Sequence, residues 1–300
     1  MNLHKLLTCF CFFIGCVAYC QIDTSRCSEV LNEDFSPRVF NLLKNKLLSN
    51  SSNANTMYLV DKNDLKIFSY NGNGVVTAGI DEQHKRIAIS YYVNTIHVYN
   101  IQTLDTIKKI DLEAKCSALS LHKDVLVYGL DNGLVKEYDF ISKKEKTIAT
   151  HAGIVRGVQV LNDGTILSIS SDGELKMNHP TKKLKHKFPK VLTAMAVSSS
   201  EEMIAIGTFD GSVYLLNRNY ETVAELAPHT SVITQIKFRN NQELITSSFD
   251  KKLINTDITT KKMTLIHTSK DYIMAFDMSA DKLIFSDRSG TVTFYNLKCQ

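Results

Sequence analysis

Histidines are the side chains of this chain best suited to metal binding or proton transfer, and nine of them are scattered along it. They are His4, His84, His97, His122, His151, His179, His186, His229 and His267. Only His179 and His186 are spaced so that one element could present both, and they lie in a lysine-rich stretch. The sequence contains no GxSxG, no HExxH, no glycine-rich phosphate loop and no CxxC after residue 20. We therefore predict a protein that is not an enzyme, with no catalytic residue, metal or cofactor.

A repeat organises most of the chain. Six equivalent dipeptides, each at the end of a predicted strand, follow one another at intervals of 38 to 40 residues, and a weaker member ends at Phe68-Ser69. The six are Tyr99-Asn100, Tyr138-Asp139, Asn178-His179, Leu216-Asn217, Thr256-Asp257 and Tyr295-Asn296. Each interval holds short runs of strand-forming residues split by turn residues, such as Phe209-Asp210-Gly211 between two apolar runs. A period of this length indicates an all-β repeat architecture over residues 57–300.

The clearest unit, from Ala227 to Asp257, resembles one repeat of the WD40 family. Pro228-His229 stands where the family has Gly-His, Asp250 lies in the predicted tight turn, and Thr256-Asp257 stands where the family has Trp-Asp. The chain has no Trp, so its repeats are divergent. The resemblance implies a WD40-type β-propeller, in which each blade buries its faces against its neighbours. Six regular units and a weaker one around residues 57–70 predict seven blades, with six as the alternative.

The resemblance also implies a structural hydrogen-bond network in two units that keep a His, a Ser or Thr, and an Asp of the family pattern. The matching residues are His151, Ser168 and Asp172 in one unit, and His229, Thr246 and Asp250 in the other. Elsewhere the pattern is eroded, because Asp210 matches the turn aspartate but its unit lacks the histidine. We interpret these residues as fixing turns, not as catalytic groups.

Residues 1–20 are predicted to be a secretory signal peptide. Lys5 precedes an uncharged, mostly apolar run from Leu6 to Tyr19, which is short for a membrane span but suits the core of a leader. Small residues favour cleavage after Cys20. Lipid attachment at Cys16, or retention of the segment in an intracellular protein, are the alternatives. The protein is therefore expected to be exported, to the periplasm or the exterior, with no membrane span after the leader.

Residues 21–56 are expected to contribute to closure of the ring. The last unit, Asp271 to Leu297, holds only three predicted strands, so we expect the region before Met57 to supply a fourth. Apolar residues at helical intervals predict a short helix over residues 38–48, with a strand as the alternative.

Three cysteines follow the leader: Cys27, Cys116 and Cys299. Cys27 and Cys299 lie near the two ends of the chain, so a closed ring could bring them together as a disulfide. Three unpaired thiols is the favoured interpretation. Cys116 lies in an apolar strand, where we expect it to pack as a small hydrophobic residue.

One stretch of the chain concentrates positive charge between residues 176 and 190. Its lysines are Lys176, Lys182, Lys183, Lys185, Lys187 and Lys190. Lysines on an exposed outer strand protect a sheet edge from pairing with another chain, and this is the favoured interpretation. The alternative is a basic patch for an acidic protein, an anionic surface or RNA. Lys143, Lys144 and Lys146 occupy the equivalent strand one unit earlier and would extend such a patch into a rim.

The sequence favours a binding platform over a catalyst. The net charge of +4 is mild and does not by itself indicate a nucleic-acid partner. The favoured function is a protein-interaction scaffold or accessory protein that assists a larger complex. The alternative is an intracellular WD40 subunit of an RNA-processing or trafficking assembly. Expected binding positions on one face of the propeller are the turns at Asp131-Asn132, Ser171-Asp172, Phe209-Asp210 and Phe249-Asp250.

Overall fold

The computed structural model describes the backbone of residues 8–13, 16–21, 28–32, 40–43, 46–50, 56–61, 64–69, 74–279 and 282–297. Side chains are described for residues 74–278 and 282–297. The described strands pair into seven four-stranded antiparallel sheets and one two-stranded sheet. Among these segments no helix is long and apolar enough to cross a membrane.

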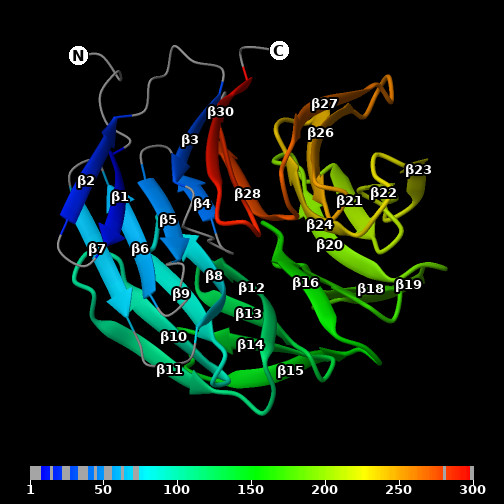
Figure 1. Cartoon of the computed structure of the whole chain (residues 1–300). Helices are drawn as coiled ribbons and strands as arrows, with labels where there is room; N and C mark the ends of the chain where they lie inside the picture. The colour runs from blue at the N-terminus through cyan, green and yellow to red at the C-terminus, as the bar shows by residue number, and fades with distance from the viewer. Residues whose placement is uncertain are drawn as a thin grey trace.

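Five of the four-stranded sheets are built from consecutive strands (Figure 1). The first holds β8 (Val75–Asp81), β9 (Arg86–Tyr91), β10 (Thr95–Asn100) and β11 (Thr106–Asp111), and the second β12 (Cys116–His122), β13 (Val125–Leu130), β14 (Leu134–Asp139) and β15 (Glu145–Thr150). The third holds β16 (Val155–Val160), β17 (Ile166–Ser170), β18 (Glu174–His179) and β19 (Lys182–Lys187), and the fourth β20 (Leu192–Val197), β21 (Met203–Thr208), β22 (Val213–Asn217) and β23 (Thr222–Leu226). The fifth holds β24 (Ile233–Phe238), β25 (Glu243–Ser248), β26 (Lys252–Asp257) and β27 (Met263–Thr268).

The remaining sheets use strands from the N-terminal region. One joins β28 (Ile273–Ser279), β29 (Lys282–Asp287) and β30 (Val292–Asn296) to β3 (Ser28–Asn32), which pairs with β30. Another consists of β4 (Phe40–Leu43), β5 (Lys46–Asn50), β6 (Thr56–Asp61) and β7 (Asp64–Ser69). The two-stranded sheet pairs β1 (Thr8–Phe13) with β2 (Cys16–Gln21). The fourth strand of the last repeat therefore comes from the region before Met57.

The second strand of each sheet explains why the sheets pack radially. Ile87 and Ile89 of β9 and Leu126 of β13 are fully buried, as are most of their neighbours in these strands. Both faces of these strands are covered, so their sequences are continuous runs of apolar and small residues and do not alternate between apolar and polar ones. The first strands of successive sheets contact one another from β8 through β28 to β4. The sheets are thus blades around a common centre (Figure 1), and the prediction of an all-β propeller is confirmed.

Six blades are built mainly or wholly from residues 74–297, and the seventh from residues 40–69. The short helix expected over residues 38–48 is wrong, because β4 and β5 form a hairpin with Leu43 opposite Lys46. The apolar pairs Leu42-Leu43 and Leu47-Leu48 fit a helical period over so short a segment. Two strands joined by a two-residue connection accommodate the same residues, and β5 pairs in turn with β6.

Several expectations about cysteines can be placed on this fold. Cys116 is fully buried on β12 among Leu126 and Leu130, as expected of a small hydrophobic residue, and this burial raises the pKa of its thiol to about 12. Cys27 and Cys299 lie outside the described residues, so a disulfide between them stays a prediction. Cleavage of the leader also stays a prediction.

Candidate functional site

One backbone hydrogen bond defines the same turn in six blades. The N–H of the residue that follows the second strand donates to the carbonyl of the residue just before the first strand of that blade. The pairs are Tyr92 to Gly74 (3.0 Å), Asp131 to Lys115 (2.9 Å), Ser171 to Ile154 (2.9 Å), Phe209 to Val191 (3.0 Å), Phe249 to Val232 (3.1 Å) and Arg288 to Tyr272 (2.8 Å). All six turns therefore lie on one face of the propeller, with the connections that enter each first strand. We call this surface the turn face.

Each of these turns contains one residue with positive φ. It is glycine in four of them, at Gly133, Gly173, Gly211 and Gly290, while Asn94 and Lys251 adopt φ of 56° and 70°. A Cβ at Gly211 would come within 2.4 Å of the His229 carbonyl oxygen, so the connection that leads from this blade to the next passes directly over this turn. The turn conformation is therefore fixed by backbone geometry as well as by hydrogen bonds.

The structure brings His229, Thr246 and Asp250 together. Nε2 of His229 lies 2.8 Å from the Thr246 hydroxyl, and Nδ1 lies 2.9 Å from Oδ2 of Asp250. Asp250 also accepts the backbone N–H of Thr230 at 3.2 Å and of Lys252 at 3.1 Å. Burial lowers the pKa of His229, although Asp250 opposes the effect, so the imidazole is neutral near pH 7. This network ties the incoming connection, the middle strand and the turn of one blade together.

His151, Ser168 and Asp172 form a looser version of this network in another blade. Nε2 of His151 lies 2.9 Å from the Ser168 hydroxyl, but Nδ1 is 3.5 Å from Oδ2 of Asp172 and makes no hydrogen bond. Asp172 instead accepts the backbone N–H of Ala152 at 2.8 Å and of Glu174 at 2.9 Å. Burial again lowers the pKa of the histidine.

These two networks have the residue types of a catalytic triad, but their geometry does not suit catalysis. The Ser168 and Thr246 side chains are fully buried within their sheets, so no substrate can reach either hydroxyl. His151, Asp172 and Glu174 also lie close enough to hold a metal ion. However, the Lys185 ammonium lies 2.5 Å from Glu174 and already supplies a cation there.

Two polar contacts on the turn face were missed by the sequence reasoning. Thr208 donates to Asp210 at 2.6 Å in the blade that lacks the histidine. In the last blade, Ser269 donates to the buried carboxylate of Asp287 at 2.5 Å. Asp287 ends its strand and does not lie within the turn, so a pattern built on turn aspartates could not find it.

The turn face exposes large apolar side chains. Phe209 is 62% exposed and Phe249 is 39% exposed, and both occupy the equivalent first position of their turns. Val191, whose carbonyl accepts the Phe209 N–H, is 42% exposed. The Phe249 ring lies 5.1 Å from the ring of Tyr272, the residue that enters the next blade. Apolar groups from two neighbouring blades therefore meet here.

The structure separates the six lysines of the basic segment. Lys176 and Lys187 donate to the backbone carbonyls of Thr150 and Asp172. Lys190 lies 2.9 Å from Asp210 and 2.7 Å from Glu225 of the next blade, and these carboxylates raise its pKa. Lys185 pairs with Glu174. Lys182 and Lys183 on the outer strand β19 are exposed and have no ion-pair partner among the described residues.

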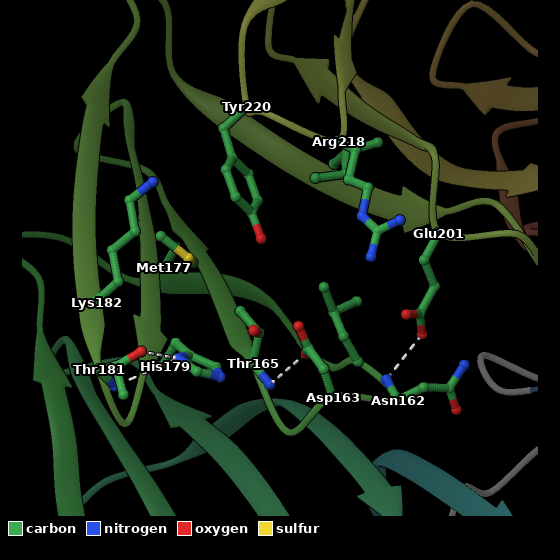
Figure 2. A pocket seen from close by; sticks show the side chains of 12 residues that line it. Asn162, Asp163, Thr165, Met177, His179, Thr181, Lys182, Glu201, Arg218 and Tyr220 are labelled. Carbon is green, nitrogen blue, oxygen red and sulfur yellow. Dashed lines mark hydrogen bonds between the residues drawn. The ribbon is translucent and has the colours of Figure 1, made fainter.

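A pocket of about 400 Å³ opens between the third and fourth sheets, on the side opposite the turn face (Figure 2). It is formed by the connections β16–β17, β18–β19, β20–β21 and β22–β23, which join the strand ends that point away from the turns. Its lining residues are Leu161, Asn162, Asp163, Thr165, Met177, His179, Thr181, Lys182, Glu201, Ile204, Arg218 and Tyr220. No local pattern along the chain predicts this pocket, because its walls come from loops of two different blades.

Comparisons with known proteins place this architecture among WD40 propellers. No family model matches the chain. The WD40 β-propeller domain of Doa1 is similar with a TM-score of 0.76 at 15% identity, covering 90% of this chain and 95% of that one. The computationally designed Ika8 protein is similar with a TM-score of 0.69 at 15% identity, covering 89% and 98%. The fold of the chain is therefore that of a WD40-type β-propeller.

One curated protein shares sequence with the chain. This protein is the ribosome biogenesis protein YTM1 of Debaryomyces hansenii, and the chain is 29% identical to it over 77 residues, which are 26% of the chain. This match spans only 16% of the length of that relative.

Proposed function

We propose that this chain is a non-catalytic scaffold that binds protein partners through its turn face. The observation that carries the proposal is the exposure of Phe209 and Phe249 at equivalent turn positions, together with Val191. Removing such a side chain from water on association is worth about 1.5–3 kcal/mol when its burial is complete. Exposed aromatic side chains on a rigid frame are typical anchors of protein interfaces.

The frame under these side chains supports the same proposal. Asp250 fixes the turn that carries Phe249 through His229 and two backbone N–H groups. The Phe209 N–H is likewise held by the Val191 carbonyl, and Thr208 donates to Asp210 in the same turn. Both phenylalanines are therefore held in one backbone conformation before a partner arrives, which reduces the entropy lost on binding.

Replacement of Phe209 by Ser tests the proposal, with Ile141→Ser as the matched control. Ile141 is 75% exposed on the connection between β14 and β15, on the side opposite the turn face. We expect partners recovered with the full chain from its native host to fall about tenfold or more for Phe209→Ser, because an anchor side chain is lost. The Ile141→Ser variant should retain them. Equal recovery with both variants, or no associated protein with the unaltered chain, would contradict the proposal.

A second candidate function is a subunit of an RNA-processing assembly. The shared sequence with a ribosome biogenesis protein favours it. The exposed ammonium groups of Lys182 and Lys183 favour it independently, because unpaired lysines on a rim attract phosphates.

The two candidates differ in where the protein would work. The apolar leader supports an exported scaffold that assists a complex in the periplasm or outside the cell. The likeness to a ribosome biogenesis protein supports an intracellular assembly. The N-terminus of the mature protein separates them.

A further inference from the structure

The pocket between the third and fourth sheets has an apolar floor and a polar wall. Leu161, Met177 and Ile204 form the floor and are nearly buried. Figure 2 shows the Tyr220 hydroxyl and the Arg218 guanidinium pointing into the pocket from the side of the fourth sheet. A volume of about 400 Å³ falls within the range of small-ligand sites.

The donors of this pocket are available for a ligand. The Tyr220 hydroxyl and the Lys182 ammonium have no hydrogen-bond partner among the described residues. Arg218 contacts Glu202 through one guanidinium nitrogen at 3.2 Å, and its side chain is 73% exposed. Burial and the nearby Asp163 raise the pKa of Tyr220, so its hydroxyl keeps its proton. Two cations and a phenol thus offer charge-assisted hydrogen bonds to an anion.

The acceptors lie beside these donors. Asp163 accepts the Thr165 N–H at 2.8 Å through Oδ1, and Glu201 accepts the Asn162 N–H at 2.9 Å through Oε1. Each carboxylate therefore has a second oxygen to offer. The hydrogen bond from Thr165 and the charges of His179 and Arg218 lower the pKa of Asp163, so it stays ionised. A ligand that bears a single anionic group must therefore also carry hydroxyl groups beside it, so that the carboxylates of Asp163 and Glu201 receive hydrogen bonds.

We propose that this pocket binds a ribonucleoside phosphate, either as a free nucleotide or as a terminal nucleotide of single-stranded RNA. The phosphate lies against Arg218, Lys182 and Tyr220, a ribose hydroxyl donates to Asp163, and the base covers the apolar floor. Carboxylates commonly accept ribose hydroxyls, and a 2′-hydroxyl distinguishes RNA from DNA. The site is separate from the turn face, so it does not depend on the scaffold function.

The neighbouring strand offers a path for further phosphates. Lys182 lines the pocket and is the first residue of β19, and Lys183 follows it along the exposed outer edge. Lys185 and Lys187 follow on the same strand but are already engaged, with the Glu174 carboxylate and the Asp172 carbonyl. A strand of RNA whose end occupies the pocket would therefore meet the positive charge of Lys183 directly beside that of Lys182.

Calorimetric titration of the full chain with each of the four 5′-ribonucleoside monophosphates tests the pocket. We expect at least one to bind, its 2′-deoxy form and its nucleoside to bind about tenfold more weakly or worse, and Arg218→Gln to reduce binding by a similar factor. Arg218 is on the surface, so this variant should fold. Asp163→Asn should reduce the preference for ribose over deoxyribose. Absence of binding by all four at millimolar concentration, or unchanged binding by Arg218→Gln, would overturn the proposal.

Fluorescence anisotropy with a labelled RNA pentamer distinguishes the two sources of the ligand. If RNA is the ligand, the Lys182→Gln/Lys183→Gln variant should bind the pentamer about tenfold more weakly. The control Lys143→Gln/Lys144→Gln removes the same charge from exposed residues of the preceding blade and should bind within about twofold of the unaltered chain. If the pentamer binds no more tightly than the mononucleotide, and Lys183→Gln leaves its affinity unchanged, the natural ligand is a free nucleotide. Equal losses in the two double variants would overturn the pocket as the binding site.

Discussion

His229 and His151 occupy equivalent positions in two blades, but only His229 makes hydrogen bonds through both ring nitrogens. In both cases the second nitrogen faces a turn aspartate, and burial keeps the ring neutral. The residues that match the family pattern thus make buried hydrogen bonds within a blade. Protonation of either imidazole would therefore destabilise the folded state, because the charged ring would be buried away from water.

The stability of the protein should fall as pH decreases from 7.5 to 5.5. The pKa of His229 is lowered in the folded state, so below about pH 6.5 the unfolded chain binds a proton that the folded chain excludes. Each such histidine contributes a slope of at most about 1.4 kcal/mol per pH unit. We expect His229→Gln to flatten the dependence of the unfolding free energy on pH, measured by urea denaturation. The control Thr246→Val weakens the network but keeps the histidine, so a flattened slope there would argue against this account.

The elements that position the turn face are the second and third strands and the turn between them. Four turns use glycine at the positive-φ position, and at Gly133, Gly173 and Gly211 an added Cβ would approach a backbone carbonyl of the connection that leads to the next blade. The turn and the connection are thus packed as one unit, and the first residue of the turn is directed outward. This arrangement exposes Phe209 while His229 and Thr208 stay buried.

Gly211→Ala should destabilise the protein more than Gly164→Ala. Both glycines have positive φ, 92° and 84°, so each substitution costs about 1–2 kcal/mol in backbone conformation. At Gly164 a Cβ meets nothing within 4 Å, whereas at Gly211 it meets the His229 carbonyl oxygen at 2.4 Å. We expect a further loss of about 1–3 kcal/mol for Gly211→Ala, measured as the difference in unfolding free energy. Equal losses would mean that the connection to the next blade, which carries His229, shifts freely.

At the scale of the molecule, the pairing of β3 with β30 joins the N-terminal region to the last blade. The two-stranded sheet of β1 and β2 pairs only with itself among the described strands. Of the strands that the structure describes, β1 and β2 therefore contribute to no blade, and removing them would leave every four-stranded sheet complete.

If the protein is exported, its mature form should begin at Gln21. Cleavage there keeps β3 and all later strands, so the propeller should stay intact. The intact mass of the protein isolated from its native host measures this directly. A lipid-modified chain beginning at Cys16 would place it on a membrane. A mass that includes residues 1–20 would contradict export and favour the intracellular assembly.

The sequence by itself determined the repeat, the all-β propeller and the residues of two turn networks, because these features are local and recur at a constant period. His229, Thr246 and Asp250 lie within one repeat, so a single repeat pattern contains all three. Tertiary structure alone decided the hairpin of β4 and β5, since a segment of eleven residues fits both periods and the pairing of β5 with β6 in a four-stranded sheet selects the strand.

The pocket also depended on tertiary structure. Asp163 and Tyr220 lie in different blades and have no common pattern along the chain, and only the radial packing of two sheets places them on opposite sides of one cavity. The same holds for the basic segment. Lys190 is neutralised by Asp210 and Glu225 of the next blade, whereas Lys182 and Lys183 stay exposed. The sequence shows how many lysines lie in this segment, but the contacts between blades decide which of them are free to contact a partner.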